Sequence, residues 1–498
     1  MLTVEEIKQF IDEDASSKKK KRAEIGQKYY DGDHDIKGYR LFYYNADGVL
    51  TEDTTRSNIK IPHCFFTELV DQGTQYILSG EEGIIKSKLP ELQTELDAYF
   101  NENEDFIAEL SEVITGCQAK GFEYMYARKN KEGKLGFECA DSLGVVEVEA
   151  RFAEDGKEHI IYHYIDRIDK NGKTIKKIIV CDDEFKYFYT QTDNGIIEPD
   201  YCFDGKALKP HATYKIEGDA KTYYEEFGFI PFFRLDNNKK QVSNLKAVKE
   251  LIDDYDLMAC GLSNNLQDAS EYLVVVSGFQ GDNLEELMQN TKTKKHIGVD
   301  EGGGVDFKTV DIPYEARKVK LELDEKNIYR FGMGLNTSGL KDTSATTNIA
   351  IKAAYSLLDL RCSKLEIRLK QFLRKIIKVV LDEINAANGT DYQWKDVYFN
   401  FNHEVMSNEQ ENAAIALTEA QKKEVLIRTL LSIAARLDNE TLMQNICEVM
   451  DIDYEEIKGK LPDPDEAANA LKDAQGGLDS VVVEDEQTAE GNAAGILG

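Results

Sequence analysis

The chain has 498 residues, 42% of them hydrophobic, which is enough for roughly two to four folded domains. Its formal charge of −31 argues against a general nucleic-acid-binding protein, because such proteins carry a basic surface for the phosphates. No apolar run approaches the ~18 residues of a membrane span, the first residues lack the pattern of a signal peptide, and the scattered cysteines are typical of reduced thiols in a cytosolic protein.

The first part of the chain changes from helical to strand periodicity at Gly121. Helices are predicted over residues 3–25, 65–78, 89–100 and 105–116, and the basic run Lys18–Arg22 is expected on a solvated helix face or in a short arm. Short strands separated by glycine-containing turns are predicted over residues 122–126, 145–152, 159–168, 176–180 and 185–190. This order predicts an α+β domain with an antiparallel meander.

The middle of the chain predicts two long helices on either side of a glycine-rich excursion. The helices cover residues 245–270 and 314–331, and the excursion contains a strand at 272–276 and the run Gly302–Gly304. Such a pair of helices makes a poor closed globule by itself. It makes sense if neighbouring subunits bury its flanks.

The longest predicted helix follows a breaker-rich segment that begins at Gly332. Its apolar positions run from Ile349 to Ile384 at helical spacing, and no Pro or Gly interrupts the chain between Gly339 and Gly389. Its N-cap candidates are Thr346, Thr347 and Asn348. Seven basic residues against the single acid Glu366 form a stripe on this helix: Arg361, Lys364, Arg368, Lys370, Arg374, Lys375 and Lys378. A solvated face is the ordinary reason for such a stripe.

The C-terminal part begins with a strand-like alternation over residues 394–401. A helical segment over 407–458 follows, with Ser407 and Asn408 as caps and a turn near Asp438. From Pro462 the composition is rich in Asp, Glu, Ala and Gly, and this predicts disorder.

The sequence contains no convincing catalytic signature. His159 and His163 lie on a predicted strand without a zinc-binding motif, and the pair His63-Cys64 lacks a third orienting group. Gly332-Met-Gly is only part of a dinucleotide fingerprint, and no phosphate-binding loop of an ATPase is present. We therefore expect no enzyme activity, no cofactor and no metal site.

Several sequence blocks, in order, resemble the portal proteins of tailed bacteriophages, in particular the type of long-tailed phages of Gram-positive bacteria. The blocks cover roughly residues 26–400 and are these: Tyr29-Tyr-x-Gly-x-His-Asp-Ile36, Asn58-Ile-Lys-Ile, Leu69-Val-Asp-Gln72, Tyr76-x-x-x-Gly80, Phe229-Ile-Pro-Phe with Asn237-Asn238, Leu251-Ile-Asp-x-Tyr-Asp256, Ile328-Tyr with Phe331, and Ile349-Ala-x-Lys352.

The resemblance implies a mostly helical α+β portal fold, assembled as a ring, usually of twelve subunits, around a channel at one capsid vertex. The implied division is an N-terminal helical arm (1–25), a wing (26–236, joined by strand 387–406), stem helices (237–276 and 313–332), a clip (277–312), a tunnel loop (333–347), a tunnel helix (348–386), a helical crown (407–460) and a disordered acidic tail (461–498).

The implied function is a conduit for genome packaging and ejection, in the virion and, during assembly, in the host cytoplasm. The implied partners are double-stranded DNA, the terminase large subunit, scaffolding and major capsid proteins and a head-completion or adaptor protein, with no membrane. The expected contacts are with DNA in the tunnel loop (Asn336, Thr337, Ser338 and Lys341), with motor, adaptor or DNA in the clip (Lys292, Lys294 and Lys295) and with the adjacent subunit along the tunnel helix (Arg361, Lys364, Arg368 and Lys375).

Two other classes of function stay open from the sequence alone. A metal-dependent cytosolic hydrolase or nuclease would use the many carboxylates, and a metal-dependent activity assay would reveal it. A helical adaptor that forms no ring would stay monomeric or dimeric, and its native mass would show this.

Overall fold

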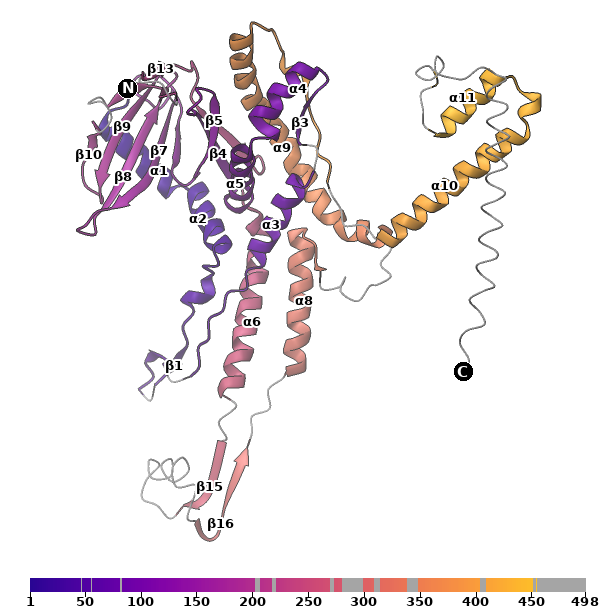
Figure 1. Cartoon of the computed structure of the whole chain (residues 1–498). Helices are drawn as coiled ribbons and strands as arrows, with labels where there is room; N and C mark the ends of the chain where they lie inside the picture. Colours follow the sequence, from indigo (N-terminus) through magenta and orange to yellow (C-terminus); the bar gives the residue numbers. More distant parts are fainter. Residues whose placement is uncertain are drawn as a thin grey trace, which may run out of the picture. The chain divides into compact units, whose positions relative to one another are not determined.

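The computed structural model describes residues 1–45, 47–54, 56–80, 83–201, 207–216, 221–268, 273–279, 299–308, 314–337, 348–403, 409–450 and 454. The chain divides into two units, which are Met1–Ser344 with Ile349–Val405, and Ala345–Asn348 with Met406–Gly498. Figure 1 shows that the described elements are a mixture of helices and strands, as the sequence predicts.

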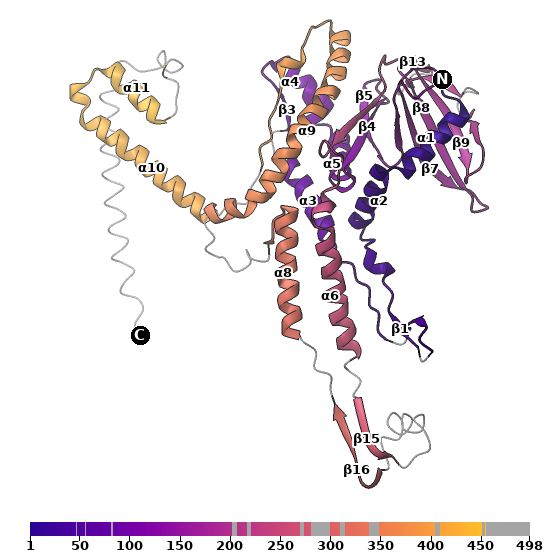
Figure 2. The same ribbon diagram turned by 180° about the vertical axis from the view of Figure 1, so that it is seen from behind.

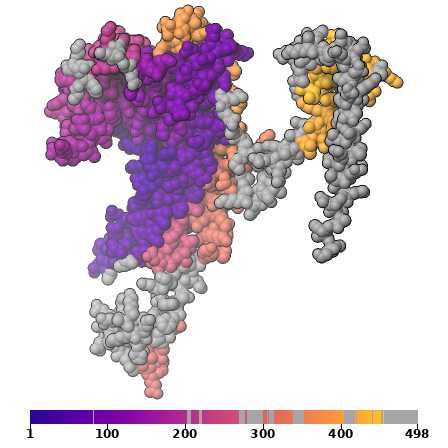
Figure 3. Space-filling view, in the orientation of Figure 1, coloured from indigo at the N-terminus to yellow at the C-terminus, as the bar shows by residue number. Residues whose placement is uncertain are grey.

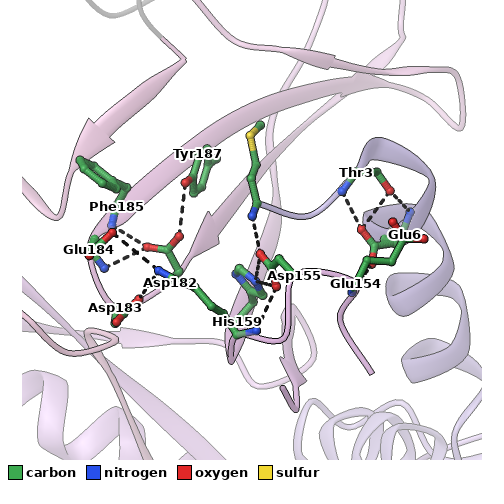
Figure 4. A network of polar contacts seen from close by, with 12 residues as sticks. Thr3, Glu6, Glu154, Asp155, His159, Asp182, Asp183, Glu184, Phe185 and Tyr187 are labelled. Atoms are coloured by element: carbon green, nitrogen blue, oxygen red, sulfur yellow. Dashed lines mark hydrogen bonds and ion pairs between the residues drawn. The ribbon is translucent and has the colours of Figure 1, made fainter. Parts of the chain in front are cut away.

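The N-terminal segment forms two helices where the sequence predicts one. α1 (Val4–Ser16) and α2 (Lys18–Tyr30) are separated by Ser17, which has extended backbone angles and accepts a hydrogen bond from the amide of Lys20. Serine favours this N-cap conformation, so it ends one helix and begins the next. α1 itself opens with a capping box between Thr3 and Glu6 (Figure 4).

The basic run that begins α2 is exposed at Lys18, Lys21 and Arg22, but the predicted solvated face is wrong for Lys20. Lys20 is 2% exposed. Its ammonium lies 2.9 Å from Asp14 and donates to the carbonyl oxygens of Ser142 and Val145. A lysine can be buried in this way because a carboxylate and two carbonyls replace its water shell. Lys20 therefore attaches α2 to the sheet domain.

The predicted antiparallel meander is confirmed. One sheet has the order β10-β9-β8-β7-β6, and β11 shares the edge of β9 with β10. Its strands are β6 (Val145–Val148), β7 (His159–Ile168), β8 (Thr174–Cys181), β9 (Phe185–Thr192), β10 (Ile197–Pro199) and β11 (Leu208–Pro210). Ile7 of α1 is fully buried against this sheet, together with Val146, Ile161, Ile178 and Val180.

A second sheet has the order β14-β4-β5 and supports helix α5 (Glu104–Lys120). Its strands are β4 (Phe122–Lys129), β5 (Leu135–Ala140) and β14 (Phe232–Asp236). A separate two-stranded sheet of β12 (Ala212–Tyr214) and β13 (Tyr223–Glu225) precedes β14 in the sequence. α5 ends at Gly121, which has a φ of 100°. A Cβ there would lie 2.7 Å from the carbonyl oxygen of Gln241. Both the positive φ and this close approach therefore favour glycine at the position.

The core of the first unit surrounds the long helix α9 (Asn348–Asn388), whose predicted extent and stop before Gly389 are confirmed. Its buried side chains include Leu365, Leu369, Phe372, Ile376 and Val380. They pack with residues of α3 (Phe65–Leu78), α4 (Pro90–Leu96) and α5 in one cluster. After α9 the chain returns as β17 (Val397–Phe399), which pairs with β3 (Ile85–Ser87).

Helices α6 (Lys249–Asp268) and α8 (Tyr314–Gly332) run side by side (Figures 1 and 2). Between them in sequence, β15 (Leu273–Phe279) pairs with β16 (Val299–Lys308). The glycine run 302–304 thus lies within a strand, with Gly304 opposite Ser277. The hairpin of β1 (Phe42–Tyr44) and β2 (Leu50–Glu52) lies on the flank of α6 away from α8 in both views.

The second unit contains α10 (Glu409–Ser432) and α11 (Asn439–Met450). The predicted turn near Asp438 is confirmed, because its side chain accepts from the amide of Thr441 at 2.9 Å and caps α11. The predicted caps Ser407 and Asn408 lie outside the described residues.

Candidate functional site

The chain reverses direction where α8 ends, and the side chain of Gln72 holds this turn. Its amide nitrogen donates to the carbonyl oxygen of Leu335 at 2.9 Å, and its amide oxygen accepts from the backbone nitrogen of Leu335, also at 2.9 Å. Met333 has a φ of 53°, and the amide of Gly334 donates to the carbonyl oxygen of Tyr329. The side chain of Gln72 in α3 therefore makes the two backbone hydrogen bonds to Leu335 that a neighbouring strand would otherwise make.

Arg361 of α9 fixes the same turn from the other side. Its guanidinium donates to the carbonyl oxygen of Gly332 at 3.1 Å and to that of Leu69 at 2.6 Å, and the residue is 9% exposed. Burial lowers the pKa of Arg361 below its usual value. Three helices, α3, α8 and α9, are joined by this side chain.

Glycines at the turn allow its close approach to α3. A Cβ at Gly334 would lie 2.2 Å from Cδ2 of Leu69, and a Cβ at Gly332 would lie 2.5 Å from Cδ1 of the same residue. A flexible joint is predicted from these glycines in the sequence. In the fold, Gly332 and Gly334 allow the backbone to pack closely against α3. We name residues 332–336, with Gln72 and Arg361, the loop base.

Replacement of Gln72 by leucine is expected to loosen the loop base without unfolding the chain. Both backbone groups of Leu335, which is 8% exposed, would lose their partners, at a cost of about 1–3 kcal/mol. Hydrogen exchange of the peptide covering 333–337 should accelerate. Gln9→Leu is the control, because Gln9 is exposed and its side chain donates a hydrogen bond to Glu13 of its own helix. Equal exchange in both variants would contradict the role of Gln72.

Segment 57–63 lies along α6 and uses its side chains as hydrogen-bond acceptors. The hydroxyl of Ser57 donates to Asp268, and three backbone amides donate in turn: Ile59 to Asn264 at 2.7 Å, Ile61 to the Cys260 sulfur at 3.2 Å, and His63 to Asp256 at 2.9 Å. Two residues of an extended chain span about 6.6 Å, and four residues of an α-helix span about 6 Å. Because these two distances nearly match, every second residue of the segment can meet every fourth residue of α6.

Asp256 is the buried end of this series. It is fully buried, and it accepts from Nδ1 of His34 at 2.7 Å and from Nδ1 of His63 at 2.8 Å. The other ring nitrogen of His34 lies 3.3 Å from the carbonyl oxygen of Tyr29, so both ring nitrogens have an oxygen atom within hydrogen-bond distance. Burial raises the pKa of Asp256, but these hydrogen bonds outweigh it and leave the pKa below its ordinary value.

The basic stripe of α9 divides into three groups. Arg361 belongs to the loop base, and three side chains lie over aromatic rings of the returning segment: Lys370 over Phe401, and Arg374 and Lys378 over Trp394. Lys364, Arg368 and Lys375 form no ion pair within the described ranges of the chain. Next to them the helix exposes Leu360 and Ile367, by 49% and 61%.

The other expected contact residues fall partly outside the described residues, namely Ser338, Lys341, Lys292, Lys294 and Lys295. Asn336 donates to Glu325 at 3.3 Å, and Thr337 is exposed. The structure places Arg361 inside its own chain, which corrects the expectation that it contacts another subunit. Gln72 and Asp256 belong to the sequence blocks, but neither residue was predicted to have a role, and the other acceptors of α6 were missed. The four-residue spacing of Asp256, Cys260, Asn264 and Asp268 was a signal for that series.

The histidines considered for catalysis each have defined surroundings in the fold. His159 is buried and lies 3.0 Å from the carboxylate of Asp155 (Figure 4). His63 contacts Asp256, and burial lowers the pKa of His163 to about 4. Within the described ranges, no group of three or more His, Cys, Asp or Glu could hold a metal ion. In that same part of the chain, no helix is both long and apolar enough to cross a membrane.

Comparisons with known proteins agree on one family. Residues 9–459 match the family described as phage portal protein, SPP1 Gp6-like. The chain is 26% identical over 391 residues to the portal protein of Bacillus phage SPP1, covering 78% of this chain and 75% of that protein. It is also 26% identical over 400 residues to the portal protein of Clostridium phage phiCD119, covering 76% and 84%.

Among solved structures, a chain in the neck of a native GTA particle, computed with C12 symmetry, is similar with a TM-score of 0.36 and 13% identity, over 77% of this chain and 89% of that chain. The resemblance in the sequence blocks is confirmed by the family match, which spans most of the chain. This protein belongs to the phage portal proteins of the SPP1 Gp6-like family.

Proposed function

We propose that the chain is one subunit of a ring at a single capsid vertex, through which double-stranded DNA is packaged and later ejected. The observation that carries this proposal is the family match over residues 9–459. The ring has no catalysis of its own in this proposal. It acts in the virion, and before that in the host cytoplasm during assembly.

The division implied by the resemblance is retained as part of this proposal. The side-by-side helices α6 and α8 would be the stem, and the β15–β16 pair the described part of the clip between residues 277 and 312. Residues 26–236 with β17 would be the wing, 333–347 the tunnel loop, α9 the tunnel helix, and α10 with α11 the crown. The pairing of β17 with β3 supports the assignment of the returning strand to the wing.

The loop base supports a role for the loop that follows it. A loop that contacts moving DNA needs a fixed origin, and Gln72 and Arg361 supply one on both sides of residues 332–335. We propose that Asn336, Thr337, Ser338 and Lys341 contact DNA at the constriction. The chain's charge of −31 would repel DNA elsewhere, which favours sliding because each tight phosphate contact would add a barrier.

Docking partners follow from the same proposal. Lys292, Lys294 and Lys295 of the clip would meet the terminase large subunit during packaging, the head-completion or adaptor protein afterwards, or DNA. Scaffolding and major capsid proteins would surround the ring during assembly. Binding of the purified ring to each partner, compared with a triple Lys→Ala variant of these positions, tests this part separately.

The face of α9 that carries Lys364, Arg368 and Lys375 would form the contact between subunits. A ring requires a heterologous interface, in which one patch of each subunit meets a different patch of its neighbour. These three cations have no ion pair within the described part of their own chain, and Leu360 and Ile367 beside them are exposed. Acidic side chains of the adjacent subunit would therefore complete this face.

Charge reversal on this face is expected to prevent ring assembly. Arg368→Glu and Lys375→Glu should each shift the purified protein from a ring of about twelve subunits toward monomers of 56.4 kDa, because like charges would then face each other. Native mass spectrometry and negative-stain images of the same samples measure this. Lys170→Glu, in the exposed turn between β7 and β8, is the matched control.

Intact rings from both α9 variants would remove this face from the interface while leaving the portal assignment in place. A wild-type protein that forms a compact dimer with metal-dependent activity would overturn the portal assignment itself.

A further inference from the structure

A pocket of about 480 Å³ lies between strands of the two sheets, away from the loop base. It is lined by residues of β4, β9, β11 and β12, among others, and it is partly open to solvent. The proposed portal function makes no use of this pocket. We name it the β4–β9 pocket.

The lining of the β4–β9 pocket is strongly basic. Five of its residues are cations, namely Arg128, Lys129, Lys186, Lys209 and Lys215, and none of the described lining residues is Asp or Glu. In a chain of charge −31 this concentration is unusual. Arg128 has Glu138 as a partner, and Lys129 has Glu225 and Glu383. A ligand is therefore inferred from Lys186 and from two hydroxyl groups of the lining.

Lys186 is a buried cation without a carboxylate partner in the described part of the chain. It is 6% exposed, its ammonium donates to the hydroxyl of Tyr126, and it lies 4.6 Å from the centre of that ring. Burial lowers its pKa to about 8, so most of the amine is still protonated at neutral pH. A buried charge in this state costs free energy unless an anion compensates it.

Two hydroxyl groups accompany this ammonium. Tyr126 accepts from Lys186, which leaves its own proton free to be donated. The hydroxyl of Thr213, which also lines the pocket, is buried and has no hydrogen-bond partner within the described ranges. A single anion with several oxygens could accept from all three groups.

We propose that the β4–β9 pocket binds a small phosphate-bearing ligand, with Lys186 as its buried counter-charge and Tyr126 and Thr213 as hydroxyl donors. Single ammonium and hydroxyl donors from different strands suit a tetrahedral anion, whereas a planar carboxylate is best held by an arginine fork, and Arg128 is already paired. Duplex DNA is excluded by shape, because a side chain that is 6% exposed cannot reach the backbone of an intact helix.

Calorimetric titration of the full-length protein with inorganic phosphate at pH 7 tests the proposal, with sodium chloride at matched ionic strength as the reference. We expect saturable binding by the wild type, and binding weaker by about tenfold or more in Lys186→Met, because a charge-assisted hydrogen bond is lost. Thr213→Val, which keeps the shape of the side chain, should weaken binding several-fold. Lys170→Met is the control for loss of an exposed lysine and should bind like the wild type.

Phosphate that gives no more heat than chloride, or equal binding by Lys186→Met and the wild type, would overturn the proposal. Competition by a nucleoside triphosphate would identify the ligand as a phosphorylated small molecule, and its absence would limit it to the free anion. Displacement of phosphate by a short DNA duplex would contradict the assignment to a small ligand. Ring assembly is measured on the same samples, so a failure of the portal proposal is seen independently.

Discussion

Replacement of Asp256 by alanine is expected to lower the free energy of unfolding by about 3–5 kcal/mol. The carboxylate is fully buried and accepts three hydrogen bonds, two from histidine rings and one from the backbone of His63. Without it, His34 remains buried with an unpaired ring nitrogen, and segment 57–63 loses its innermost anchor on α6. Urea unfolding followed by circular dichroism measures the change.

Hydrogen exchange shows which part of the chain is loosened by Asp256→Ala. The amides of Ile59, Ile61 and His63 should exchange faster in Asp256→Ala, because the series of acceptors on α6 loses its first member. Asp254→Ala is the matched control, since Asp254 lies on the same helix but pairs at the surface with Lys320, a contact expected to contribute less than about 1 kcal/mol. Equal destabilisation by both variants would show that the buried Asp256 network stabilises the chain no more than a surface ion pair does.

The Asp256 network also predicts acid sensitivity. The pKa of Asp256 lies below its ordinary value of 3.8 in the folded chain, so the unfolded chain binds this proton first as the pH falls. The stabilisation is fully present above about pH 4 and is lost as the pH falls through the folded value. The stability difference between the wild type and Asp256→Asn should therefore shrink over that range, and a constant difference would contradict it.

Two glycine substitutions within helices are expected to have opposite signs. Alanine at Gly26 of α2 would place a Cβ 2.0 Å from the carbonyl oxygen of Ala119 in α5. Because this oxygen belongs to the backbone, it cannot move aside by a side-chain rotation. The helices would have to separate, at a cost that exceeds the roughly 1 kcal/mol gained in helix propensity. We expect a net loss of about 2–3 kcal/mol.

Gly261 of α6 is the matched comparison. Among the residues that the structure describes, a Cβ there meets only a side-chain nitrogen of Arg317, at 3.4 Å, so Gly261→Ala should stabilise the chain by about 0.5–1 kcal/mol. Both variants are measured by urea unfolding under the same conditions. If Gly26→Ala is as stable as Gly261→Ala, the close packing of α2 on α5 is wrong.

Much of the secondary structure could be predicted from local signals. α3, α8 and α9 begin and end close to their predicted bounds, because apolar spacing, caps and a following glycine are encoded within the element itself. The strands β6 to β9 of the meander could also be predicted, since glycine turns such as the one at Gly172, with a φ of 77°, connect neighbouring strands. The break at Ser17 was missed because serine is tolerated inside helices as well as at their ends.

The candidate site was predicted only in part. The breaker-rich segment after α8 marked the loop, but Gln72, which holds its base, lies 263 residues away in sequence. Charged side chains were the least predictable residues. Lys20, Arg361 and Lys186 resemble surface residues in the sequence, yet each is buried in the fold.

The sequence by itself determined the helices, the meander and, through its ordered blocks, the family. Only the tertiary structure decided which strand pairs with β3, which side chains accept from segment 57–63, and which cations of α9 are used inside the chain. The physical reason is that periodicity and caps act within a few residues. The environment of a charge is instead set by backbone carbonyls and carboxylates that the fold brings from distant parts of the chain.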